Sequence, residues 1–102
     1  MEAVLTQEVF ARHANSKFHA QIDELTSVEL ELTEVSDVNL HPQQEEFVIV
    51  FRGPSDKFLG QGVLSFSHDQ MGQFELFLVP IKQDEQGFYY EAVFNRLREQ
   101  NT

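Results

Sequence analysis

The sequence contains no cysteine among its 102 residues, so disulfide bonds, thiolate nucleophiles and thiolate metal sites are excluded. It also lacks a long apolar run near its start, where Glu2, Glu8, Arg12 and Lys17 interrupt the first twenty residues. We therefore expect neither a signal peptide nor a membrane span. A cytoplasmic location is the default expectation that follows.

Basic side chains are scarce. Seven lysines and arginines face seventeen aspartates and glutamates, which gives a formal net charge of -10. Such a charge opposes binding to nucleic acid and to anionic membranes. Residues 23–46 hold eight of the carboxylates and no Lys or Arg. This segment predicts a solvated, negatively charged strand face, and the alternative is a surface for a basic partner or a cation.

No motif for a metal, a cofactor or nucleophilic catalysis is present. The histidines lie far apart and in no zinc-binding spacing: His13, His19, His41 and His68. None of the glycines lies in a loop that leads into a predicted helix, where backbone N–H groups could bind phosphate. Ser65 and Ser67 do not lie between a strand and a helix, as the serine of a nucleophile elbow does. We expect no cofactor, no metal and no enzymatic activity.

The residues that are present predict one compact domain over residues 1–102. Apolar residues make up 41% of the chain, and ten of them are phenylalanines, which supply the area that a small core needs. A short helix is predicted over residues 6–13, with Thr6 as its N-cap. Residues 16–95 are predicted to form a β-meander. Residues 96–98 could add a final helical turn, and 99–102 are predicted to be a frayed tail.

Period-two alternation of apolar and polar side chains defines the predicted strands, because successive side chains on a strand point to opposite faces. Six strands are predicted, at 17–23, 28–33, 47–51, 63–67, 74–81 and 88–94. The second continues irregularly to residue 38, with a bulge expected near Glu34. Residues 40–44 are predicted to be a connection. The last two joins are hairpins ending in Gly72 and Gly87, residues that tolerate positive φ.

These strands predict a mainly β fold, an antiparallel meander of six strands that closes toward a small barrel, with one short N-terminal helix. Closing the sheet is the best way for a chain this short to cover its edges. The expected interior consists of Phe18, Leu30, Leu32, Phe47 or Val48, Phe66, Phe74, Leu76, Leu78, Tyr90, Ala92 and Phe94. A barrel of this size packed with Phe leaves little space for a small-molecule ligand.

Six residues are candidates for contact with a partner: Arg52, Pro54, Phe58, His68, Asp69 and Tyr89. The adjacent His68 and Asp69 are the nearest approach to a catalytic pair, but neighbours on an extended segment point apart. Arg52 ends a strand after the acidic segment, where either an ion pair or an anion contact fits. Tyr89 and Tyr90 should face opposite sides, so one hydroxyl meets water while the other needs a buried partner.

Three segments carry a resemblance to a known family: FVIVFRGP at 47–54, GQFELFLVPI at 72–81 and YEAVFN at 90–95. The chain resembles a family of small bacterial domains of unknown function, over most of its length. Val63 and Met71 depart from the family's usual residues but keep their apolar character. The resemblance implies no catalytic residue. It implies an association with phage-tail-like systems.

Two functions follow as hypotheses. The first is a non-enzymatic interaction or assembly module that binds a protein partner or self-associates as a homo-oligomer. The second is a small-ligand binder or minor enzyme with a cleft near Arg52, His68 and Asp69.

Overall fold

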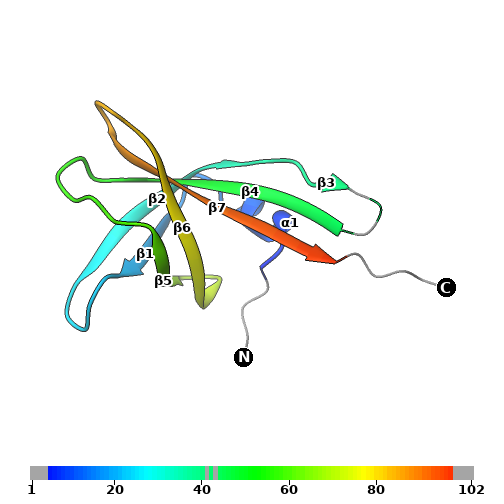
Figure 1. Ribbon diagram of the computed structural model, residues 1–102. Coiled ribbons are helices and arrows are strands. Elements are labelled where there is room, and N and C mark those ends of the chain that lie inside the picture. The colour runs from blue at the N-terminus through cyan, green and yellow to red at the C-terminus, as the bar shows by residue number, and fades with distance from the viewer. Residues whose placement is uncertain (1–4, 41, 43, 98–102) are drawn as a thin grey trace.

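The computed structural model describes residues 5–40, 42 and 44–97 (Figure 1). In this part of the chain one helix precedes seven strands. The elements are α1 (Gln7–Arg12), β1 (Lys17–Gln21), β2 (Ser27–Val35), β3 (Asn39–Leu40), β4 (Gln44–Gly53), β5 (Gly62–His68), β6 (Gly72–Asp84) and β7 (Gly87–Leu97).

Six of the strands close into an antiparallel barrel. Around the barrel their order is β1, β2, β4, β7, β6 and β5, and β5 pairs again with β1. The longest ladder joins β4 to β7, from Gln44 opposite Leu97 to Gly53 opposite Phe88. The two-residue β3 lies outside the ring, on β4. The predicted six-stranded barrel with one short helix is therefore confirmed.

The connection between β4 and β5 refines the predicted meander. β1, β2 and β4 follow one another around the barrel, and so do β5, β6 and β7. Residues 54–61, however, lead from β4 to a strand that pairs with β1 and β6. β5 cannot lie beside β4, because β7 pairs along the whole length of one edge while β2 and β3 pair along the other.

The ends of several elements differ from the predictions. Leu40 belongs to β3 and Gln44 begins β4, so the predicted connection at 40–44 is shorter than expected. Arg96 and Leu97 continue β7 instead of forming a helical turn, because their backbones pair with Glu45 and Gln44 of β4. Residue 98 and the predicted tail at 99–102 lie outside the described residues.

Helix α1 begins as the sequence predicts. The Oγ1 atom of Thr6 accepts a hydrogen bond from the backbone N–H of Val9 at 3.2 Å, which satisfies a donor that the first turn leaves unpaired. Arg12 forms an ion pair with Glu8 one turn earlier. The helix has few turns of its own, so its position depends on the burial of Phe10, which is 0% exposed.

The core fills the barrel with the predicted inner-face side chains. All of them are buried apart from Phe94, which is half-buried, and Phe47 rather than Val48 faces inward. The prediction omitted Phe10. Its ring centroid lies 5.3–6.4 Å from those of four other phenylalanines, Phe18, Phe47, Phe74 and Phe94.

The barrel wall opens between β6 and β7. These strands pair from Asp84 opposite Gly87 only as far as Val79 opposite Glu91. Beyond that point, residues 72–78 of β6 pair with β5 alone, and residues 92–97 of β7 pair with β4 alone, as far as the described residues show. Figure 1 shows the two strands diverging from their crossing. We call the gap between these two unpaired edges the split.

Both predicted hairpin glycines occupy the left-handed half of backbone space, with φ of 84° at Gly72 and 143° at Gly87. Gly87 also has no space for a larger side chain. A Cβ atom there would lie 1.9 Å from the carbonyl oxygen of Gly53, on the adjacent strand β4.

Candidate interaction surface

The six candidate contact residues lie at opposite ends of β5 and β6. Arg52 and Tyr89 face each other across β4 and β7, at the end where the β6–β7 hairpin closes the barrel. His68 and Asp69 lie at the β5–β6 turn, at the other end of those two strands. The structure thus brings Arg52 close to Tyr89 and does not bring it close to His68.

Arg52 forms an ion pair within the fold. Its Nη2 donates to Oε1 of Glu31 at 2.6 Å, and its Nη1 donates to Oε1 of Gln86 at 3.0 Å. Lys17 reaches the same carboxylate oxygen of Glu31 at 3.3 Å. The side chains of Arg52 and Glu31 are 29% and 21% exposed, so the contact is partly shielded from water. Both terminal nitrogens of Arg52 are therefore engaged in contacts within the fold.

Tyr89 is held in a similar polar contact. Its hydroxyl donates to Oδ2 of Asp84 at 3.0 Å, and Lys82 Nζ lies 4.6 Å from the centre of its ring. The hydrogen bond to Asp84 raises the pKa of Tyr89. The pKa of Asp84 is lowered, chiefly because the backbone N–H of Gln86 donates to it.

Tyr90 points the opposite way, as the alternation predicts. It is 0% exposed, and its hydroxyl accepts a hydrogen bond from the backbone N–H of Leu59 at 2.9 Å. Burial raises the pKa of this phenol. The bond fastens the 54–61 loop across the barrel end. Within that loop Pro54 is half-buried, while Phe58 is 57% exposed and contacts the ring of Phe88 at 5.1 Å.

His68 makes a set of contacts that sequence reasoning did not find. Its Nδ1 accepts hydrogen bonds from the backbone N–H groups of Gln70 at 3.1 Å and Met71 at 3.2 Å. The proton of the neutral ring therefore lies on Nε2, which donates to Oγ of Ser16 at 3.0 Å. The Ser16 hydroxyl in turn donates to the backbone carbonyl of His13 at 2.5 Å.

A serine hydroxyl 3.0 Å from a histidine ring invites comparison with a catalytic dyad. A general base must accept the serine proton at its unprotonated nitrogen, with an orienting acceptor on the other side. Here both roles are reversed, because Nε2 holds the proton and Nδ1 faces two backbone donors. Asp69 is exposed and makes no hydrogen bond to His68 among the described contacts. The contact between Ser16 and His68 is structural.

The ring of His68 lies against two others. Its centroid is 4.3 Å from that of Phe18 and 4.8 Å from that of His13. Burial is the main cause that lowers the pKa of His68, and the proximity of His13 acts in the same direction. A neutral imidazole at this position joins the C-terminal end of α1 to the β5–β6 turn.

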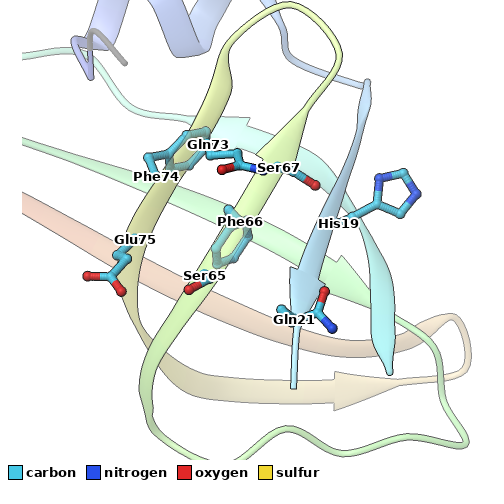
Figure 2. A pocket seen from close by; sticks show the side chains of 8 residues that line it. All are labelled: His19, Gln21, Ser65, Phe66, Ser67, Gln73, Phe74 and Glu75. Carbon is cyan, nitrogen blue, oxygen red and sulfur yellow. The ribbon is translucent and has the colours of Figure 1, made fainter. Parts of the chain in front are cut away.

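An open hollow of about 430 Å³ lies over β1, β5 and β6 (Figure 2). Its ionisable side chains do not converge. Figure 2 shows His19 and Glu75 on opposite sides, pointing away from each other, with Ser65 and Ser67 on the strand between them. His19 instead lies 3.8 Å from Glu29 on the neighbouring strand. This arrangement brings no nucleophile and base together.

The outward surface of the barrel carries apolar side chains that the sequence interpretation did not single out. Val63 and Phe77 face each other across β5 and β6 and are 61% and 50% exposed. Val93 is 50% exposed and faces the half-buried Val48 across β7 and β4. We call Val48, Val63, Phe77 and Val93 the outer apolar face. The sequence could have indicated this face, because these apolar residues occupy strand positions at which the alternating pattern predicts polar side chains.

Carboxylates surround the outer apolar face. Four lie on its strands or on the adjacent β2, namely Glu34, Glu46, Glu75 and Glu91, and none has an ion-pair partner among the described residues. By contrast, Arg12, Lys17 and Arg52 all pair with glutamates. No group of three or more His, Asp or Glu side chains is placed to hold a metal in the described ranges 5–40, 42 and 44–97. No helix in those ranges is long and apolar enough to cross a membrane.

The fold and this surface define a small closed β-barrel whose interior is filled with side chains and whose exterior bears an apolar face among carboxylates. The profile of a family described as a domain of unknown function, DUF6916, matches residues 5–94. The chain belongs to this family, as the resemblance implied. No curated protein and no solved structure matched the chain.

Proposed function

We propose that this protein is a non-enzymatic interaction module that binds another protein through the outer apolar face. One observation carries the proposal. Val63, Phe77 and Val93 are each at least half exposed, although the barrel has an interior that buries side chains of the same kind. Exposed apolar residues gathered on neighbouring strands are typical of protein contact surfaces.

The polar groups support the same proposal. Arg52 and His68, two of the three residues expected near the alternative cleft, are engaged in contacts within the fold. Tyr89, a candidate for partner contact, is engaged in the same way. A catalytic site needs a base and a nucleophile, or a metal, beside a space for the substrate. The second hypothesis, a ligand-binding or catalytic cleft near Arg52, His68 and Asp69, is weakened because these residues lie at opposite ends of β5 and β6.

The location and the biological setting belong to the proposal as well. We propose a cytoplasmic protein that acts within a multiprotein assembly, and the family resemblance favours assemblies of the phage-tail type. Unpaired carboxylates beside the apolar face favour a partner with basic groups over a second copy of this chain.

The proposal is tested by reconstitution with purified components. A partner identified by affinity capture should bind the purified chain saturably, and Val63→Lys should weaken that binding. The matched control is Leu25→Lys, because Leu25 is also an exposed apolar residue, at 96%, but lies between β1 and β2. Equal affinity of both variants and the wild type would contradict the proposed surface.

A thermal-shift panel of metals, nucleotides and metabolites tests the second hypothesis. We expect no shift from any member of the panel. A reproducible shift that His68→Ala abolishes would instead favour a ligand site.

A further inference from the structure

We propose that the split between β6 and β7 accepts an extended, basic segment of a partner protein by strand addition. This inference rests on the proposed interaction function and specifies where and how the partner binds. The segment would pair its backbone with one or both unpaired edges. Its side chains would alternate between the outer surface and the aromatic floor of the split.

Two strand edges border the split. Residues 72–78 of β6 and 92–97 of β7 each pair with a neighbour on one side only, within the described part of the chain. Such edges present N–H and C=O groups that can template another strand. At about 3.3 Å per residue, an edge of about six residues is roughly 20 Å long, which suits a short peptide segment.

Two exposed apolar side chains also border the split. The β6–β7 ladder ends at Val79 opposite Glu91, and continuing its register would place Phe77 opposite Val93. These two residues are therefore the first outward-pointing side chains on either side of the split, and each is 50% exposed. An added strand would cover both. Cross-strand apolar pairs of this kind stabilise sheets.

The inner side of the split is closed by aromatic rings. The Phe10 ring of α1 lies 6.0 Å from Phe74 of β6 and 5.3 Å from Phe94 of β7, measured between centroids. Phe94 remains half-buried. Phe10 and Phe74 are buried, so the ring of Phe94 is the part of this floor that the inward-facing side chains of an added strand would contact, and apolar residues are expected at alternate positions of the segment.

Negative charge beside the split favours basic residues at the outward positions of the segment. Glu75 projects from β6 and Glu91 from β7, on the same outward faces as Phe77 and Val93, and neither has an ion-pair partner among the described residues. Lysine or arginine at the outward positions of the segment would neutralise them. A second copy of this chain is a poorer occupant, because its net charge of -10 would add repulsion.

The test uses the full chain and a capped synthetic peptide in which lysine and valine alternate over seven positions. We expect saturable binding and new protection from amide hydrogen exchange at residues 73–78 or 92–95. A peptide of the same sequence that is N-methylated at every residue has no backbone N–H donor for strand pairing and is the matched control. Equal binding of both peptides, or binding without protection at either edge, would overturn strand addition.

Two variants locate the site. Phe77→Lys and Val93→Lys each place a like charge beside the incoming lysines and should weaken peptide binding at least about tenfold, which corresponds to about 1.4 kcal/mol. Leu25→Lys adds the same charge far from the split and should bind as the wild type does. Circular dichroism confirms that each variant is folded. Unchanged affinity in both folded variants would overturn the assignment to the split.

The remaining outcomes separate this inference from the proposed function. If a purified partner binds and Val63→Lys weakens it, but neither edge becomes protected, the interaction function stands and strand addition is wrong. If neither the peptide nor any partner binds, both proposals fail. If light scattering shows a dimer that Val93→Lys dissociates, the occupant is a second copy and the commitment to a basic partner is overturned.

Discussion

At the end of the barrel that carries the β6–β7 hairpin, which we call the hairpin end, β6 and β7 pair strand to strand. At the other end, which we call the helix end, they separate and the Phe10 ring of α1 lies between them. The hairpin end is held by backbone ladders, by the Arg52–Glu31 ion pair and by the hydrogen bond from Leu59 to Tyr90. The helix end is held by aromatic contacts and the neutral ring of His68. The two ends of the barrel thus close in different ways, and at the second end the described residues of β6 and β7 do not pair with each other.

The largest effect should come from removing the side chain that fills the helix end. Phe10→Ala should cost about 3–5 kcal/mol of unfolding free energy, because it leaves a cavity among four other phenylalanines. Urea unfolding measures the cost. The control is Phe58→Ala at the hairpin end, where a side chain that is 57% exposed should matter far less. Similar midpoints for the two variants would contradict the central role of Phe10.

At the hairpin end the sharpest test is Gly87→Ala. The added methyl group would meet the Gly53 carbonyl oxygen at 1.9 Å and would require φ of 143°, so we expect a loss of about 2–3 kcal/mol. Gly60→Ala is the matched control, since nothing lies within 4 Å of a Cβ atom there. Thermal unfolding should separate the two variants. A Gly87→Ala protein as stable as Gly60→Ala would show that the two strands can move apart freely.

The pH dependence of stability distinguishes the helix end. The pKa of His68 is lowered from 6.5 in the folded protein, so the unfolded chain takes up the proton first as the pH falls. Its contribution is present above about pH 6.5 and is lost as the pH falls through the lower folded pKa. Protonation also removes the Nδ1 acceptor of the β5–β6 turn.

We therefore expect wild type to lose more stability between pH 7.5 and 5 than His68→Gln. Urea unfolding at several pH values measures the difference. Groups that act on His68 electrostatically are His13 on the α1 side, His19 on β1 and Asp69 in the turn. Parallel profiles for wild type and His68→Gln would exclude a role for His68 protonation.

The smallest effect is expected from the ion pair at the hairpin end. Arg52→Met should cost about 0.5–1 kcal/mol, because the pair is partly exposed and Lys17 remains beside Glu31. Raising the salt concentration should shrink the difference from wild type. A loss as large as that from Phe10→Ala would mean that the hairpin end depends on charge and not on strand pairing.

Several features were predictable from the sequence because they depend on local patterns. Alternation located the strands, and it gave the inner face through Phe18, Leu30 and Tyr90, since a strand has only two faces. Thr6 predicted the start of the helix, and Gly72 and Gly87 predicted the hairpins. The candidate site was less predictable, because exposure of Phe77 depends on which elements cover the outside of the barrel.

By itself, then, the sequence determined the strands, their two faces, the turns and the acidic character, because each depends on residues that are neighbours in the chain. Only the tertiary structure decided the crossing from β4 to β5, the contact of His68 with Ser16, and the split that Phe10 lines. Each of these joins segments far apart in sequence. Such pairings depend on which edges and cavities remain after the other strands have paired, and a local sequence pattern does not contain that information.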